Sequence, residues 1–207
     1  MPAPERIFLV DDDPAVRTSL ARVLREAGWV VEGFETAEDF LAREDAEGHG
    51  CVVLDLHMPG LDGLALQEQL LRSGASLPIV FVTGHGDIPS TVRALKAGAA
   101  DFLTKPVEAQ ALIHAVREAL LKQASKRRAD ADLELLRERF ATLTPREREV
   151  LDALAQGKLN KQIASELGIV EQTVKFHRAR LMERLQAHTV AELMHISARL
   201  GVGPGGH

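Results

Sequence analysis

The chain has 207 residues, of which 45% are hydrophobic and 27% are charged, and its net charge is −5. This composition supports one or two globular domains, and no apolar run is long enough to span a membrane. A single cysteine excludes an internal disulfide framework. The first residues lead straight into a strand-like run and do not resemble a signal peptide, so we expect a cytoplasmic protein without membrane contact.

The charge is unevenly distributed along the chain. Residues 1–121 hold 10 basic and 19 acidic side chains, residues 122–142 hold 6 and 4, and residues 143–207 hold 9 and 7. An acidic first half followed by a mildly basic second half predicts two domains with different partners. The basic excess is too small to establish nucleic-acid binding, so that conclusion depends on motifs.

The first half alternates short apolar runs with segments whose apolar residues recur three or four positions apart. The apolar runs, which predict strands, are 7–10, 30–34, 51–54, 79–82 and 101–103. Gly28, Gly74 and Gly98 follow helical segments, where glycine commonly ends a helix. Five repeats of strand and helix predict a five-stranded parallel sheet with helices on both faces.

Residues 122–142 are rich in charge and contain neither proline nor glycine, and Leu133, Leu136 and Phe140 repeat at helical spacing. We predict a helical linker here, with a flexible tether as the alternative. Four helices are expected after it, at 145–156, 160–167, 171–185 and 189–200, followed by a glycine-rich, disordered tail. The predicted organisation is a domain at 1–121, a linker at 122–142 and an all-helical domain at 143–207.

Polar side chains stand where four of the five predicted strands end. Asp11 and Asp12 follow the first strand, Asp55 ends the third, Thr83 ends the fourth and Lys105 follows the fifth. Sites in open parallel sheets form beyond the carboxyl ends of the strands, so these side chains are expected to converge. A single aspartate at a strand end is more often a helix cap or a surface residue, but the joint placement is hard to reach by accident.

This set of groups suits the transfer of a phosphoryl group to a carboxylate. A divalent cation relieves the repulsion between clustered carboxylates, and Mg²⁺ prefers oxygen ligands. Metal, ammonium and hydroxyl groups stabilise the charge on the transferred group, and a carboxylate is able to act as the nucleophile.

The motifs Val10-Asp11-Asp12, Leu54 to Gly63, Val82 to His85 and Lys105-Pro106 resemble those of receiver domains, over about residues 5–121. The resemblance implies a flavodoxin-like fold in which Asp55 is phosphorylated. It implies that Lys105 pairs with the phosphoryl group, that Thr83 hydrogen-bonds it and that the Lys105–Pro106 peptide is cis. The groups implied to bind Mg²⁺ (or Mn²⁺), with Asp11 acting through a metal-bound water and His57 through its backbone carbonyl, are Asp11, Asp12, Asp55 and His57.

The same resemblance implies a switch. A phosphoryl group adds negative charge and acceptor oxygens; Thr83 moves toward it and Phe102 rotates inward. This movement reshapes a face formed by residues 88–97, 101–104 and the helix from 108, through which such receivers often dimerise. The alternative for Phe102 is an ordinary core residue. His57 and His85 lie near the site and either tune hydrolysis of the phosphoryl group or are unremarkable loop residues.

Residues 143–185 carry the signals of a helical DNA-binding unit. Thr144, Pro145 and Glu147 suit a helix start, and Gly168 permits the tight turn between two helices. A helix at 171–185 has one apolar face and an opposite face that is exposed and partly basic, so it is able to enter a major groove. From the helix pattern alone, a small protein-binding domain with a solvated charged face is equally favoured.

The residue string from Leu143 to His177 resembles the LuxR-type helix-turn-helix, over about residues 143–200. Together with the receiver motifs and the stretch His85 to Pro89, it makes the whole chain similar to the FixJ branch of the NarL/FixJ response regulators. The resemblance implies phosphate contacts from Lys161 and Thr173, and contacts to base edges from Lys175, Phe176 and Ala179. The full candidate DNA-binding set is Lys161, Gln172, Thr173, Lys175, Phe176, His177, Ala179 and Arg180.

Two residues near the recognition helix differ from this pattern. Arg178 leans toward the buried side of the helix, which favours a structural or phosphate-binding role. Val170 stands where the family usually has serine or a similar cap, and loss of a cap costs about 1 kcal/mol of stability.

The sequence therefore predicts a two-component response regulator that is phosphorylated on Asp55 by a sensor histidine kinase. The phosphorylated chain is expected to bind an operator in double-stranded DNA as a homodimer, with RNA polymerase as a further candidate partner, and not to act as a turnover enzyme. An alternative is an aspartyl-phosphate hydrolase of the haloacid dehalogenase type, but His57 stands where that chemistry needs a second acid. A regulator with a vestigial receiver is disfavoured by the full set of acceptor-site residues.

Overall fold

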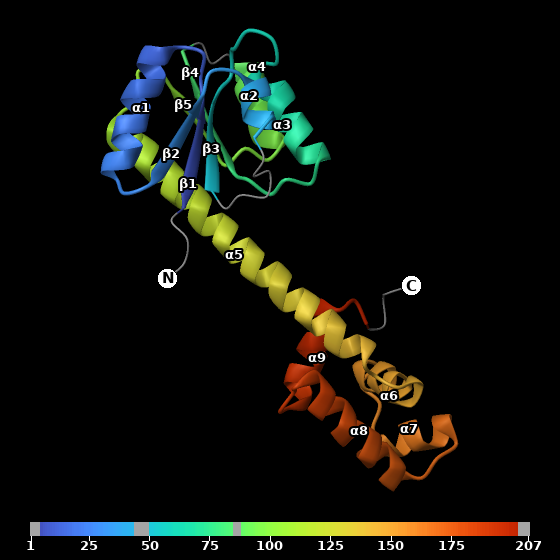
Figure 1. Ribbon diagram of the computed structural model, residues 1–207. Helices are drawn as coiled ribbons and strands as arrows, with labels where there is room; N and C mark the ends of the chain where they lie inside the picture. The colour runs from blue at the N-terminus through green and yellow to red at the C-terminus, as the bar shows by residue number, and fades with distance from the viewer. Residues whose placement is uncertain (1–4, 44–49, 85–87, 203–207) are drawn as a thin grey trace. The chain divides into compact units, whose positions relative to one another are not determined.

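The computed structural model describes residues 5–43, 50–84 and 88–202 (Figure 1). Its first part contains a parallel sheet of five strands in the order β2-β1-β3-β4-β5. The strands are β1 (Arg6–Val10), β2 (Val30–Phe34), β3 (Gly50–Asp55), β4 (Ile79–Thr83) and β5 (Asp101–Thr104). This strand order is the flavodoxin-like one, so the predicted fold class is confirmed.

Helices cover both faces of the sheet, as predicted (Figure 1). On one face, Leu24 and Val116 pack against Ile7 of the sheet, and on the other Phe40 packs against Phe8. The first face is covered by α1 and α5, the second by α2, α3 and α4. The helices are α1 (Pro14–Glu26), α2 (Ala37–Leu41), α3 (Gly63–Arg72), α4 (Ile88–Lys96) and α5 (Ala109–Ala141).

The chain divides into two compact units between Lys126 and Arg127, a point within α5. Residues 122–141 are helical, which confirms the helical linker and excludes the flexible tether. The predicted domain limits at 121 and 142 stay predictions. The predicted disorder of the tail concerns mainly residues 203–207, which lie outside the described residues.

The second unit contains the four predicted helices, α6 (Pro145–Ala155), α7 (Asn160–Leu167), α8 (Glu171–Leu185) and α9 (Val190–Arg199). Their apolar faces share one core, in which Val150, Ile163, Val174 and Leu193 are fully buried. Each of these helices has apolar residues at helical spacing along one face. The four segments fold together because this packing removes the apolar faces from water.

Local signals fix the helix ends of the second unit. Thr144 and Glu147 form a reciprocal capping box at the start of α6. Gly168 ends α7 with φ 66°, a left-handed conformation that favours glycine. Val170 precedes α8 without any side-chain cap, as its apolar side chain predicts.

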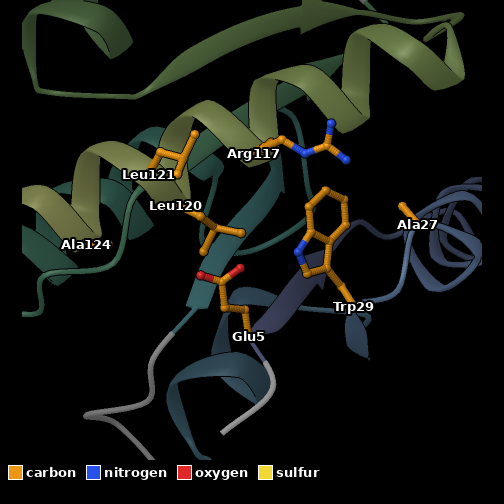
Figure 2. Close-up of a pocket in the computed structure, with 7 residues that line it drawn as sticks. All are labelled: Glu5, Ala27, Trp29, Arg117, Leu120, Leu121 and Ala124. Carbon is orange, nitrogen blue, oxygen red and sulfur yellow. The ribbon is translucent and has the colours of Figure 1, made fainter. Parts of the chain in front are cut away.

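A small pocket of about 190 Å³ lies where β1 begins (Figure 2). Trp29, the only tryptophan of the chain, forms one wall, and Leu120 and Leu121 of α5 form another. Glu5 precedes β1 and Trp29 precedes β2, so the pocket lies at the amino ends of these strands. None of the helices in the described residues is both long and apolar enough to cross a bilayer.

Candidate functional site

The carboxyl ends of the strands bring three aspartates together, as predicted. Asp11 and Asp12 directly follow β1, and Asp55 is the last residue of β3. Oxygen atoms of the three side chains lie within 4.8 Å of one another. Asp11 and Asp55 are buried, at 1% and 7% exposure, whereas Asp12 is exposed. The cluster therefore has one open side toward solvent.

Lys105 reaches into this cluster from the loop after β5. Its Nζ lies 2.7 Å from Asp11 Oδ2 and 2.6 Å from Asp55 Oδ2, and donates a hydrogen bond to each. The Lys105–Pro106 peptide bond is cis, as predicted. Because charge-assisted hydrogen bonds of this length are strong, the ammonium group holds the two buried carboxylates at one point.

Burial and charge act in opposite directions on the two buried partners. Burial raises the pKa of Asp11 above its ordinary value of 3.8, although the hydrogen bonds from Lys105 and from the Asp13 N–H lower it. Burial lowers the pKa of Lys105, but the hydrogen bonds to Asp11 and Asp55 outweigh this effect and the pKa lies above 10.5. Lys105 is therefore a cation throughout the neutral range.

The loop after β3 is fixed by close backbone contacts. The His57 N–H donates to Asp55 Oδ1 over 3.2 Å, and the Gly63 N–H donates to the Leu56 carbonyl over 3.0 Å. A Cβ atom at Gly63 would lie 2.3 Å from the Asp55 carbonyl oxygen, which no side chain tolerates. Glycine is required here because the start of α3 crosses directly over the end of β3.

Thr83 is fully buried at the end of β4, beside this loop. Its Oγ1 lies 3.3 Å from His57 Nδ1, so the exposed histidine ring contacts the predicted switch residue. Phe102 on β5 is half-buried and lies 6.1 Å from Phe81, measured between ring centroids. His85 lies outside the described residues.

Two structural contacts near the cluster were not anticipated from the sequence. Arg17 Nη1 donates to the Asp11 carbonyl oxygen over 2.6 Å, and thereby ties α1 to the end of β1. Asp13 caps α1 by accepting hydrogen bonds from Ala15 N and Val16 N. Asp13 stands directly before Pro14 and a helical segment, and this pattern could have identified it as a helix cap. Nothing in the sequence indicates that Arg17 reaches back to a carbonyl group.

The predicted recognition helix, α8, presents the expected two faces. Val174, Leu181 and Leu185 are fully buried, whereas Phe176 is 57% exposed. Most of the other candidate DNA-binding residues are exposed, and Thr173 and His177 are half-buried; the set comprises Lys161, Gln172, Thr173, Lys175, His177, Ala179 and Arg180. A surface with basic and aromatic groups on one helix suits a DNA groove.

The acidic cluster also fits a divalent cation. Its donors are three carboxylates, which are hard oxygen ligands, and a single ammonium group leaves an excess of negative charge among them. The cluster thus combines a nucleophilic carboxylate with groups that stabilise negative charge.

Comparison with known proteins identifies both units. The family of response regulator receiver domains matches residues 7–117, and the luxR family of bacterial regulatory proteins matches residues 141–197. Transcriptional regulatory protein FixJ of Azorhizobium caulinodans is 41% identical over 204 residues, which cover 99% of this chain and 97% of that protein. Nodulation protein W of Bradyrhizobium diazoefficiens is 42% identical over 196 residues, which cover 95% and 86%.

A solved structure is similar over nearly the same length. The structure of the response regulator StyR is 48% identical with a TM-score of 0.82, and the match covers 95% of this chain and all of that one. The family is one of regulators and not of catalytic enzymes, which excludes the phosphatase alternative. A receiver domain implies a histidine kinase partner, and the helix-turn-helix implies binding to DNA. The chain therefore belongs to the two-component response regulators with a LuxR-type DNA-binding domain, and is a transcription regulator.

Proposed function

We propose that Asp55 accepts a phosphoryl group from a sensor histidine kinase, and that the phosphorylated chain regulates transcription in the cytoplasm by binding DNA as a homodimer. The observation that carries the proposal is the position of Lys105, whose ammonium group lies 2.6 Å from Asp55 and 2.7 Å from Asp11. The proposed organisation is a receiver at 1–121, a linker at 122–142 and a DNA-binding domain at 143–207.

Each residue of the cluster has a separate role in phosphoryl transfer. An oxygen of Asp55 attacks the phosphorus atom of the kinase's phosphohistidine, the P–N bond breaks and the imidazole leaves, while Lys105 and Thr83 donate hydrogen bonds to the transferred group. Asp12, Asp55 and the His57 carbonyl would hold Mg²⁺ (or Mn²⁺), with Asp11 acting through water, and the ion would supply charge neutralisation. The completeness of this set argues against a vestigial receiver.

An exposed apolar stripe supports dimer formation. Ile88, Val92 and Leu95 lie on one side of α4 and are 80%, 42% and 46% exposed. Their spacing of four and three residues makes them neighbours along the helix. Such a stripe is typical of a surface that a second protein covers, and the switch through Thr83 and Phe102 would reshape this side of the receiver. RNA polymerase is a further candidate partner of the DNA-bound form.

Phosphoryl uptake from radiolabelled acetyl phosphate, followed by footprinting on genomic DNA, tests the proposal. We expect Asp55→Asn to fold but to take up no label, to remain monomeric in sedimentation and to lose phosphorylation-dependent protection of DNA. The matched control is Asp13→Asn, since asparagine caps α1 as well as aspartate does, and it should label normally. Label retained on Asp55→Asn contradicts the assignment.

A further inference from the structure

A basic groove lies in the DNA-binding unit beside the recognition helix. It has a volume of about 520 Å³ and is bounded by the end of α6, the start of α7, one flank of α8 and the first residue of α9. Three cationic side chains line it, Lys158, Lys161 and Arg178. The sequence left the role of Arg178 open between a structural one and a phosphate-binding one.

The charges in the groove are only partly balanced. Lys158 is paired with Glu166 over 2.5 Å, and Glu171, the one acid that lines the groove, is paired with Lys175 over 3.4 Å. Lys161 and Arg178 make no hydrogen bond or ion pair with any residue that the structure describes. Arg178 is half-buried. Two cations without an acidic partner leave the groove with an excess of positive charge, so the groove is suited to an anion.

The place of Arg178 on α8 indicates what kind of anion. Arg178 follows Glu171 by two helical turns, and both line the groove on the same flank. Phe176, which is 57% exposed, lies on the opposite side of the helix. When Phe176 faces the bases, Arg178 cannot reach them. The anion that runs beside a helix in the major groove is the DNA backbone, and a guanidinium group binds a phosphate through two parallel hydrogen bonds.

We propose that a backbone phosphate of DNA binds in this groove, held by Arg178 with the help of Lys161. The proposal rests on the proposed function, because it requires α8 to lie in the major groove. Arg178 then adds affinity to every DNA sequence and contributes no sequence selectivity. The competing explanation is a structural role for Arg178. In that case its aliphatic part packs on the apolar core and its charge contributes nothing to DNA binding.

Salt dependence separates a phosphate contact from other roles, because each neutralised phosphate adds about 0.9 to the slope of log K against log salt concentration. The experiment uses the full-length chain phosphorylated with acetyl phosphate, and measures binding to a duplex enriched from genomic DNA and to a random-sequence duplex. Arg178→Met keeps the stem and removes the charge. The matched control is Arg199→Ala, since Arg199 is exposed on α9 and does not line the groove.

For Arg178→Met we expect weaker binding to both duplexes by the same factor, and a salt slope smaller by about 1 per subunit. Arg178→Lys should restore most of the slope. Arg199→Ala should leave both slopes unchanged. The thermal unfolding temperature of each variant is measured alongside, so that a folding defect is recognised.

Three outcomes overturn the inference. An unchanged slope means that Arg178 contacts no phosphate, whatever happens to affinity. A loss confined to the enriched duplex means that Arg178 reads bases. A slope that falls equally in Arg178→Met and Arg199→Ala reflects net charge alone. If the wild-type chain binds neither duplex, the proposed function fails as well, whereas weakened binding by Lys175→Ala with an unchanged Arg178→Met slope leaves that function intact.

Discussion

Lys105 decides the charge balance of the receiver site. It is the one basic side chain paired with the carboxylate groups of Asp11 and Asp55 among the described residues, and both acids are buried. Without it, two carboxylates would share a poorly hydrated pocket. The raised pKa of Asp11 indicates that burial is already costly to its charged form.

We therefore expect Lys105→Met to lower the free energy of unfolding at neutral pH by about 1–3 kcal/mol and to slow phosphoryl uptake. The pKa of Lys105 is higher in the folded than in the unfolded state, so its contribution is present below pH 10.5 and is lost as the pH rises through its folded pKa. Urea denaturation of both proteins across this range measures the difference. A difference that grows above pH 10.5 would contradict this account.

The hydrogen bond between His57 and Thr83 acts on the proposed switch. The His57 ring lies 3.3 Å from Thr83 Oγ1 and holds the hydroxyl group in its present rotamer. If Thr83 turns toward the phosphoryl group, this bond must break, at a cost of about 0.5–1.5 kcal/mol.

His57→Ala should therefore ease phosphorylation-dependent dimer formation, by up to about tenfold in the acetyl phosphate concentration needed. In a Thr83→Ala background the same substitution should have no further effect. Sedimentation of the four proteins of this double-mutant cycle gives the coupling. Additive effects would show that the two side chains act independently.

At the scale of elements, the sequence was most informative where a pattern repeats. The five strands and the helices of both units follow from apolar periodicity, and strand ends located Asp11, Asp55, Thr83 and Lys105. Contacts between elements were not predictable in the same way. The basic groove joins four helices, and the His57 ring reaches Thr83 across 26 positions, so neither leaves a local signal.

The start of α8 has no side-chain cap. Val170 is 68% exposed and its side chain accepts no hydrogen bond, whereas Thr144 and Thr189 cap α6 and α9. Val170→Ser should raise the free energy of unfolding of the DNA-binding unit by about 1 kcal/mol. Urea denaturation followed by circular dichroism measures this, and Thr144→Ala, with a loss of similar size, calibrates it. An unchanged or lowered stability of Val170→Ser would mean that water already satisfies this helix end.

At the scale of the whole molecule, the two units have separate cores and separate candidate sites. The receiver holds the acidic cluster and the DNA-binding unit holds α8, and the division falls between Lys126 and Arg127. The uneven distribution of charge along the sequence predicted that the chain has two domains. The position of the division could not be predicted, because it falls inside one continuous helix.

A ligand that binds one unit should stabilise that unit alone. At a Mg²⁺ concentration of about 100 times the Kd, we expect a gain of about 2.7 kcal/mol in the receiver and none in the DNA-binding unit. Differential scanning calorimetry with and without Mg²⁺ tests this, with Asp12→Ala as the variant in which the gain disappears. A shift of both transitions would show that the units unfold together.

Trp29, which lines the small pocket of the receiver, is an intrinsic fluorescent probe of the folding of that unit. The chain has one tryptophan and no tyrosine, so its intrinsic fluorescence comes from a single indole in the receiver. The DNA-binding unit has no tryptophan or tyrosine, whereas helices of both units contribute to the far-ultraviolet dichroism. A loss of dichroism that occurs without a change in fluorescence would therefore report the melting of the DNA-binding unit, in the unmodified protein.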